Sequence, residues 1–145
     1  MKLHVSMNVP DLKDAIRFYS NLFATEPMIV RENYAKWDVE NPAVNFVVES
    51  GRENTGFDHI GIQVSDEEEL EQLTTRMENT GNPYLGVEKT TCCYAKMEKA
   101  WVRGEANEPW EGFLTHAHDS EEYGTDREGI LPDRHQVTAD QKPCC

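Results

Sequence analysis

Two stretches of the chain follow the same pattern, and this internal repeat constrains the fold more than any other feature. The stretches are HVSMNVPD, from His4 to Asp11, and HIGIQVSD, from His59 to Asp66. In each, a histidine opens a segment in which apolar and polar residues alternate, as in a half-buried strand. An aspartate follows where helical spacing begins. The repeat predicts one structural unit used twice, with the two histidines at matching positions.

The first module is predicted to contain a strand, a helix and three further strands. A strand over residues 2–8 places His4 on its polar face, together with Ser6 and Asn8. The spacing of the apolar residues that follow predicts an amphipathic helix from Asp11 to about Phe23, with Asp11 near the N-cap. Short strands are then expected near residues 27–31, 34–39 and 44–49.

The second module repeats this order. A strand is predicted over residues 57–64, followed by a helix that begins at Asp66 and has Gly81 as its C-cap. About four strands are expected after the helix, near residues 84–87, 91–96, 100–103 and 110–114. The predicted fold class is therefore α+β, built from two βαβββ modules.

Length and composition indicate one domain over residues 1–115, with modules at about 1–50 and 57–115. Residues 116–145 are polar and lack sustained periodicity, so a flexible tail is expected there. The chain has 27 acidic and 14 basic residues and a net charge of -13. This balance argues against a nucleic acid or anionic membrane as partner.

Targeting features point to the cytoplasm. No stretch approaches the roughly 20 apolar residues of a membrane span, and the start, MKLHVSMNVP, has no apolar signal-peptide core. Four cysteines form two adjacent pairs, Cys92 with Cys93 and Cys144 with Cys145. In a reducing compartment we expect them as thiols rather than disulfides.

The matched histidines indicate a metal site. A single histidine is more often a hydrogen-bonded structural residue, but His4 and His59 occupy equivalent places and face small or polar neighbours. Glu111, in WEGFL, is the expected third ligand, because its neighbours are apolar or aromatic. The alternative for Glu111 is an exposed position on a half-buried strand. Asn45 would hold the corresponding place in the first module, and the competing carboxylates, in a polar linking region, are Glu98, Glu105 and Glu108.

Two imidazoles and one carboxylate on one face of a metal leave positions open, as in non-haem Fe(II) oxygenases. Zinc and manganese are alternatives to iron. A structural zinc site would be expected to use the cysteines. The predicted site is therefore open and catalytic.

The adjacent cysteines of TTCCYAK form a second candidate site. On a regular strand, Cys92 and Cys93 point to opposite faces, so they bind one atom together only where the segment bulges or loops. A dithiol of that kind suits thiophilic species such as trivalent arsenic or Cd²⁺. The alternative is one buried and one exposed cysteine without a ligand. Cys144 and Cys145 are either an accessory thiol pair or without function.

The paired modules and their HxxxxVxD-like openings resemble the vicinal oxygen chelate superfamily of glyoxalases, bleomycin-resistance proteins and extradiol dioxygenases. The similarity covers Met1 to about Thr115 and implies a glyoxalase-like fold with a curved mixed sheet. More narrowly, the runs NYAKW, DHIGIQV, TTCCYAKMEKAW and WEGFLT are similar to organoarsenical carbon-arsenic lyases and the related cadmium-induced proteins.

This resemblance implies an Fe(II)-dependent dioxygenase that uses O2 to cleave the carbon-arsenic bond of trivalent organoarsenicals such as methylarsenite, releasing arsenite. It implies that His4, His59 and Glu111 hold the iron and that Cys92 and Cys93 hold the arsenic. Two other functions stay open: a cadmium- or arsenic-binding protein without turnover, and a glyoxalase-like metal-dependent enzyme. A monomer and a homodimer are both compatible with the resemblance.

Overall fold

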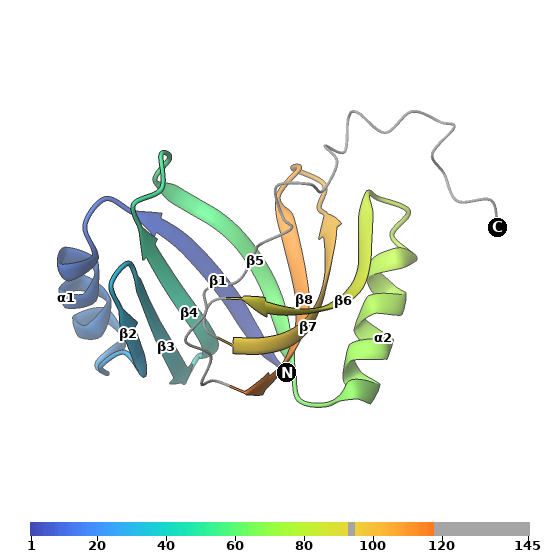
Figure 1. Cartoon of the computed structure of the whole chain (residues 1–145), viewed down its shortest axis with the longest axis horizontal. Helices are drawn as coiled ribbons and strands as arrows, with labels where there is room; N and C mark the ends of the chain where they lie inside the picture. Colours follow the sequence, from blue (N-terminus) through green and yellow to red (C-terminus); the bar gives the residue numbers. More distant parts are fainter. Residues whose placement is uncertain (93–94, 118–145) are drawn as a thin grey trace. The chain divides into compact units, whose positions relative to one another are not determined.

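A computed structural model describes residues 1–92 and 95–117 of the protein, the part drawn in colour in Figure 1. Within these residues it contains two helices and eight strands. In chain order they are β1 (Lys2–Val9), α1 (Leu12–Phe23), β2 (Ile29–Arg31), β3 (Tyr34–Glu40), β4 (Ala43–Ser50), β5 (Gly56–Val64), α2 (Glu67–Glu78), β6 (Tyr84–Cys92), β7 (Ala95–Arg103) and β8 (Pro109–Ala117). The predicted α+β class with two βαβββ modules is confirmed.

The chain divides into two compact units, and the division falls inside β5. One unit spans residues 2–61, and the other consists of Met1 and the chain from Ile62 onward. His59, which opens the second repeat, therefore belongs to the same compact unit as His4.

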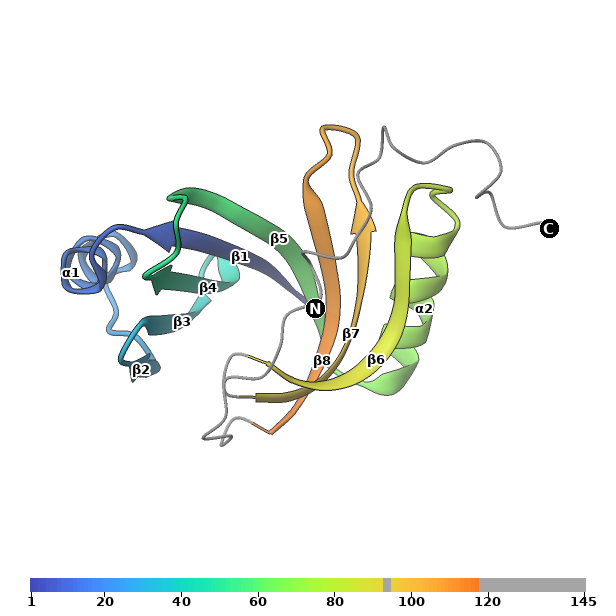
Figure 2. The same ribbon diagram turned by 45° about the horizontal axis from the view of Figure 1, so that its top comes forward.

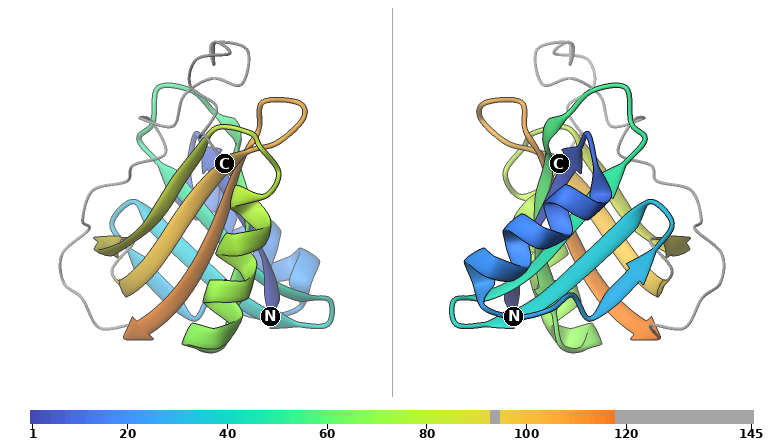
Figure 3. Two further views of the ribbon diagram at one scale, coloured as in Figure 1. Left: turned by 90° about the vertical axis from the view of Figure 1, so that its right-hand side faces the viewer. Right: turned by 90° about the vertical axis from the view of Figure 1, so that its left-hand side faces the viewer.

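In the first unit the strands follow the order β2-β3-β4-β1-β5. β1 pairs in parallel with β4, whereas β3 is antiparallel to β2 and β4, so the sheet is mixed. Helix α1 packs against β3 and β4 (Figure 3). Aromatic rings fill the space between them, with the Tyr19 and Phe46 centroids 4.5 Å apart and those of Phe23 and Phe46 5.2 Å apart. Trp37 is fully buried in this core.

In the second unit the order is β5-β8-β7-β6, with antiparallel pairing of β6 with β7 and of β7 with β8. Helix α2 packs on β6, β7 and β8 (Figure 2). Gly112 allows a close approach between helix and sheet, because a Cβ at this position would lie 2.8 Å from the Sδ of Met77. Even-numbered residues of β8 near Gly112 therefore face α2, and Glu111 points to the opposite face of the strand.

Two predictions for the second module are wrong. Within the described residues, three strands follow α2 rather than four, because β6 runs without a break from Tyr84 to Cys92 and β7 from Ala95 to Arg103. A register shift between Leu85 and Glu88 interrupts the alternation of β6, as expected at a bulge. The C-cap of α2 is Asn79, not Gly81. Gly81 does adopt the left-handed conformation, with a φ of 72°, but it lies two residues after the cap.

The predicted tail, residues 116–145, lies mostly outside the described residues. β8 continues through Ala117, so the first two residues of the predicted tail belong to a strand. Residues 118–145, including Cys144 and Cys145, lie outside the described part of the chain. Within that described part, neither helix has the length and apolar character needed to cross a membrane.

Both predicted helix starts are confirmed by their N-caps. The Asp11 side chain accepts a hydrogen bond from the backbone N–H of Asp14 at 2.8 Å, and Asp66 accepts one from Glu69 at 2.8 Å. The Glu69 carboxylate accepts in turn from the N–H of Ser65 at 2.9 Å. These bonds satisfy donors that a helix leaves without an intrahelical partner.

Replacing Asp66 with alanine is expected to lower the free energy of unfolding by about 1 kcal/mol, because the N–H of Glu69 loses its acceptor. Asp66→Ser keeps an acceptor and should remain within a few tenths of a kcal/mol of the parent. Urea denaturation of both variants measures the difference. Equal losses in the two variants would show that capping is not the cause.

Candidate metal centre

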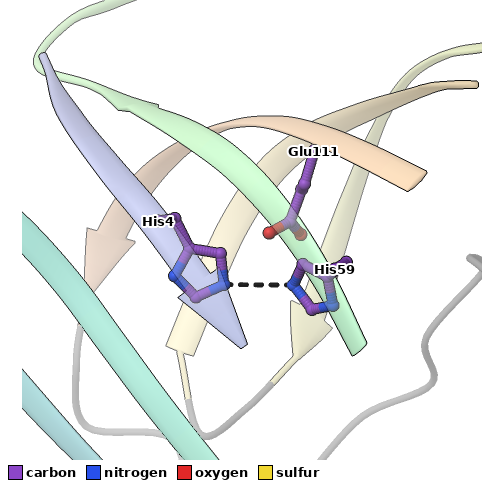
Figure 4. A group of neighbouring side chains, drawn as sticks. All are labelled: His4, His59 and Glu111. Atoms are coloured by element: carbon purple, nitrogen blue, oxygen red, sulfur yellow. Dashed lines mark hydrogen bonds between the residues drawn. The ribbon is translucent and has the colours of Figure 1, made fainter. Parts of the chain in front are cut away.

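His4 and His59 meet on neighbouring strands of the first unit, β1 and β5. Both are buried, with 6% of each residue exposed. Their Nε2 atoms lie 3.0 Å apart, and the ring planes are tilted by 47° (Figure 4). The two histidines that the repeat placed at matching positions are therefore in direct contact.

The opposite nitrogen of each ring is held by an acceptor. His4 Nδ1 lies 3.0 Å from the backbone oxygen of Asn45, the residue opposite His4 in the parallel pairing of β1 with β4. His59 Nδ1 lies 2.6 Å from Asp58 Oδ2. A carbonyl and an ionised carboxylate only accept hydrogen bonds, so Nδ1 carries the proton in both rings. Both histidines are thus held in the tautomer whose Nε2 has a lone pair.

This arrangement has the geometry of a cation site. Two neutral rings in these tautomers direct two lone pairs at a shared region, and a hydrogen bond between them would require one ring to become an imidazolium. A metal at about 2.0–2.1 Å from each nitrogen, with an angle of about 90–110° between the bonds, separates the nitrogens by about 2.8–3.4 Å. The observed 3.0 Å falls in this range. The donor pair fits a metal ion.

Asp58 supports His59 electrostatically. Partial burial would raise the pKa of the Asp58 carboxyl, but the contributions that lower it are larger in sum: the hydrogen bond with His59 first, then the hydrogen bond from Asn8 and the nearby charge of Arg52. The net effect holds the pKa of Asp58 below its ordinary value. The carboxylate therefore remains ionised and able to accept the proton of His59 Nδ1.

Glu111 is described within the second unit, where it lies on β8 with 5% of the residue exposed. The predicted alternative, an exposed residue on a half-buried strand, is wrong. The Glu111 carboxylate lies 3.2 Å from the Nζ of Lys99, whose side chain is only 1% exposed. Lys99 also lies over the ring of Trp101, with its Nζ 5.1 Å from the centroid. Glu111 is thus an ionisable group in an interior where a carboxylate needs a partner.

The competing carboxylates have other partners. Glu98 lies in β7 rather than in a linking region, where it forms an ion pair with Lys89 at 3.1 Å and a hydrogen bond with His116 Nε2 at 3.0 Å. Hydrogen bonds from these two groups lower the pKa of Glu98 below its ordinary value. Glu108 accepts from Trp110 Nε1 at 2.9 Å. Glu105 lies in the turn between β7 and β8, where it accepts from Asn82.

The predicted arsenic ligands are only partly covered. Cys92 is the last residue of β6, and its side chain is outside the described part of the chain, as is Cys93 entirely.

The sequence did not predict two charged residues that contact the predicted metal ligands, Asp58 and Lys99. Asp58 had one visible signal, its position directly before His59.

Solved structures of low sequence identity share this fold. Methylmalonyl-CoA epimerase from Mycobacterium tuberculosis aligns with a TM-score of 0.58 at 16% identity, covering 79% of this chain and 87% of that one. A glyoxalase/bleomycin resistance protein/dioxygenase superfamily member from Vibrio splendidus 12B01 aligns with a TM-score of 0.52 at 16% identity, covering 79% and 97%. The fold is that of the vicinal oxygen chelate superfamily, as predicted.

Proteins of similar sequence define the family more narrowly. A trivalent organoarsenical cleaving enzyme from Thermomonospora curvata is 35% identical over 115 residues, covering 78% of this chain and 76% of that protein. The cadmium-induced protein CadI from Mycobacterium bovis is 33% identical over 153 residues, covering 99% and 92%. No family model matches the chain. The chain belongs to the family of the trivalent organoarsenical cleaving enzymes and CadI.

Proposed function

We propose that this protein is an Fe(II)-dependent dioxygenase that cleaves the carbon-arsenic bond of trivalent organoarsenicals such as methylarsenite, releasing arsenite for arsenic detoxification. The observation that carries the proposal is the pair of buried imidazoles whose Nε2 atoms converge at a separation suited to a metal. Membership in a family that contains trivalent organoarsenical cleaving enzymes supplies the substrate class.

The proposed ligand set is His4, His59 and Glu111. Each of these residues is buried and offers one ligand atom of a type that divalent metals accept. Two imidazoles and a carboxylate form the facial set associated with non-haem Fe(II) oxygenases. The set lacks thiolates, which supports an open catalytic site over a structural zinc site. Zinc and manganese remain alternatives.

The bound iron would supply open coordination positions and the redox chemistry that O2 requires. The residues of the chain have separate tasks. Asn45 and Asp58 fix the imidazole orientations through Nδ1, and burial of the histidines limits competition from water. Cys92 and Cys93, as thiolates, would hold the arsenic atom and so position the substrate for reaction.

The relation to CadI favours a second candidate function, capture of Cd²⁺ or arsenic by thiols without turnover. The two functions predict different effects of substituting the histidines and the cysteines. Turnover requires the histidines, whereas capture alone requires the cysteines. A glyoxalase-like enzyme, the third possibility, would work without oxygen and tolerate loss of both cysteines. Arsenite release by the Fe(II)-loaded protein, compared between parent and cysteine variants, therefore tests the proposal.

The double variant Cys92→Ser/Cys93→Ser is expected to lose methylarsenite affinity by roughly 100-fold or more, because the second thiolate of a pair binds at a high effective concentration. Fe(II) affinity should stay unchanged. Arsenic that coelutes with the protein on gel filtration, quantified by mass spectrometry, measures the loss.

The matched control is Cys144→Ser/Cys145→Ser, which removes the other adjacent pair. It should bind and cleave methylarsenite like the parent. Normal arsenite release by the Cys92→Ser/Cys93→Ser variant would contradict the proposed arsenic site and favour a glyoxalase-like enzyme.

A further inference from the structure

The two histidines of the pair are supported unequally. His4 Nδ1 meets a neutral backbone carbonyl, that of Asn45, at 3.0 Å. His59 Nδ1 meets the carboxylate of Asp58 at 2.6 Å. The repeat itself contains the difference, because the residue before His59 is an aspartate and the residue before His4 is Leu3.

Asp58 is itself held in place from β1. Its Oδ1 accepts a hydrogen bond of 2.6 Å from the Nδ2 of Asn8, while Oδ2 faces His59. Both carboxylate oxygens are thus engaged, each with a different donor. The chain of contacts Asn8, Asp58 and His59 connects β1 to β5 within one compact unit. Only 27% of the Asp58 side chain is exposed, which limits its freedom to turn away.

We propose that Asn8 and Asp58 are positioning residues that make His59 the stronger of the two imidazole ligands and leave His4 the weaker one. A carboxylate on the distal nitrogen fixes the ring and increases the basicity of the ligating nitrogen. A neutral carbonyl fixes the ring with a weaker effect on basicity. This inference rests on the part of the proposed function in which the histidines bind a metal, and it is independent of the arsenical and of oxygen.

Asp58→Asn is expected to weaken Fe(II) affinity by about 10- to 100-fold, because it retains the size and an acceptor but removes the charge. Asn8→Ala removes the donor that orients Asp58 and should produce a smaller loss in the same direction. The matched control is Asp14→Asn, an exposed aspartate on α1 that pairs with Arg17. Affinity is measured anaerobically by chelator competition, and the control should equal the parent.

A double-mutant cycle separates positioning from a general loss of negative charge. In the His4→Gln background, Asp58→Asn should again weaken Fe(II) binding about 10- to 100-fold. In the His59→Gln background, the same substitution should have little further effect. An equal loss in both backgrounds, or no loss in the parent, would overturn the inference.

The metal-free protein provides a second readout that does not depend on measurable affinity in the weakest variants. Nitrogen-15 chemical shifts of the imidazoles report which nitrogen carries the proton. We expect His59 to be protonated at Nδ1 in the parent and to lose this preference in Asp58→Ala, whereas His4 keeps it. An unchanged His59 signature would contradict the positioning role.

Failure of this inference is distinguishable from failure of the proposed function. Parent protein that binds Fe(II) while Asp58→Asn binds equally well refutes the positioning role alone. Parent protein that binds no Fe(II) refutes both. A third outcome is that the parent binds Fe(II) and the double-mutant cycle gives the expected result, but arsenite is never released. This outcome refutes the proposed lyase activity and leaves the positioning role intact.

Discussion

His59→Gln is expected to abolish metal-dependent turnover and to weaken Fe(II) affinity by at least about 100-fold. Loss of a residue that only supports a metal ligand typically lowers metal affinity by about 10- to 100-fold, so loss of the ligand itself should lower it further. Glutamine keeps much of the volume of the buried ring, which limits the effect on packing. Methylarsenite binding should persist, because the proposed arsenic ligands are Cys92 and Cys93.

The matched control is His116→Gln. His116 lies on β8 and bonds to Glu98, so the substitution removes an imidazole that has no part in the proposed metal set. Fe(II) affinity by chelator competition and the circular dichroism spectrum are measured for both variants. Unchanged Fe(II) affinity in His59→Gln would eliminate this residue as a ligand.

Lys99→Met is expected to lower the free energy of unfolding of the metal-free protein by about 3–5 kcal/mol, because it leaves the Glu111 carboxylate buried without its cation. The Lys99 and Glu111 side chains are only 1% and 6% exposed, so water cannot replace the lost ammonium. Lys99→Met/Glu111→Leu removes both charges and should recover much of the loss. Urea denaturation measures all three proteins.

The control for this prediction is Lys89→Met. The Lys89 side chain is 86% exposed, and loss of its ion pair with Glu98 should cost less than about 1 kcal/mol. Metal provides a second comparison, since a ligand that binds only the folded state stabilises it. If Glu111 binds Fe(II), saturating metal should reduce the difference in free energy of unfolding between Lys99→Met and the parent. Equal stability of Lys99→Met and parent without metal would contradict the prediction.

The parts of the fold that the sequence predicted well are those set by local signals. The βαβββ order follows from alternation, helical spacing and the two aspartates, and both aspartates are the observed N-caps. The extra strand and the wrong C-cap occurred where local signals are ambiguous. A bulge between Leu85 and Glu88 breaks the alternation of β6, and the glycine that looked like a cap lies two residues beyond Asn79.

The part of the candidate site that could be predicted is the histidine pair, because the internal repeat places both histidines at matching positions. Matching positions on two related strands predicted that His4 and His59 could meet, and they do. Their role as metal ligands, with Glu111, stays a prediction. The supporting contacts of Asn8 with Asp58 and of Lys99 with Glu111 depend on which strands become neighbours, and strand spacing along the chain does not reveal this. The same limit applies to Asn45, whose carbonyl reaches His4 through the pairing of β1 with β4.

The central claim is tested most directly by following arsenic through one reaction. The protein is reconstituted anaerobically with Fe(II), given methylarsenite, and divided into samples with and without O2 before the arsenic species are separated and quantified. The account predicts that arsenite forms only when Fe(II) and O2 are both present. Arsenite formed equally well without O2, or methylarsenite that stays bound and intact in its presence, would contradict it.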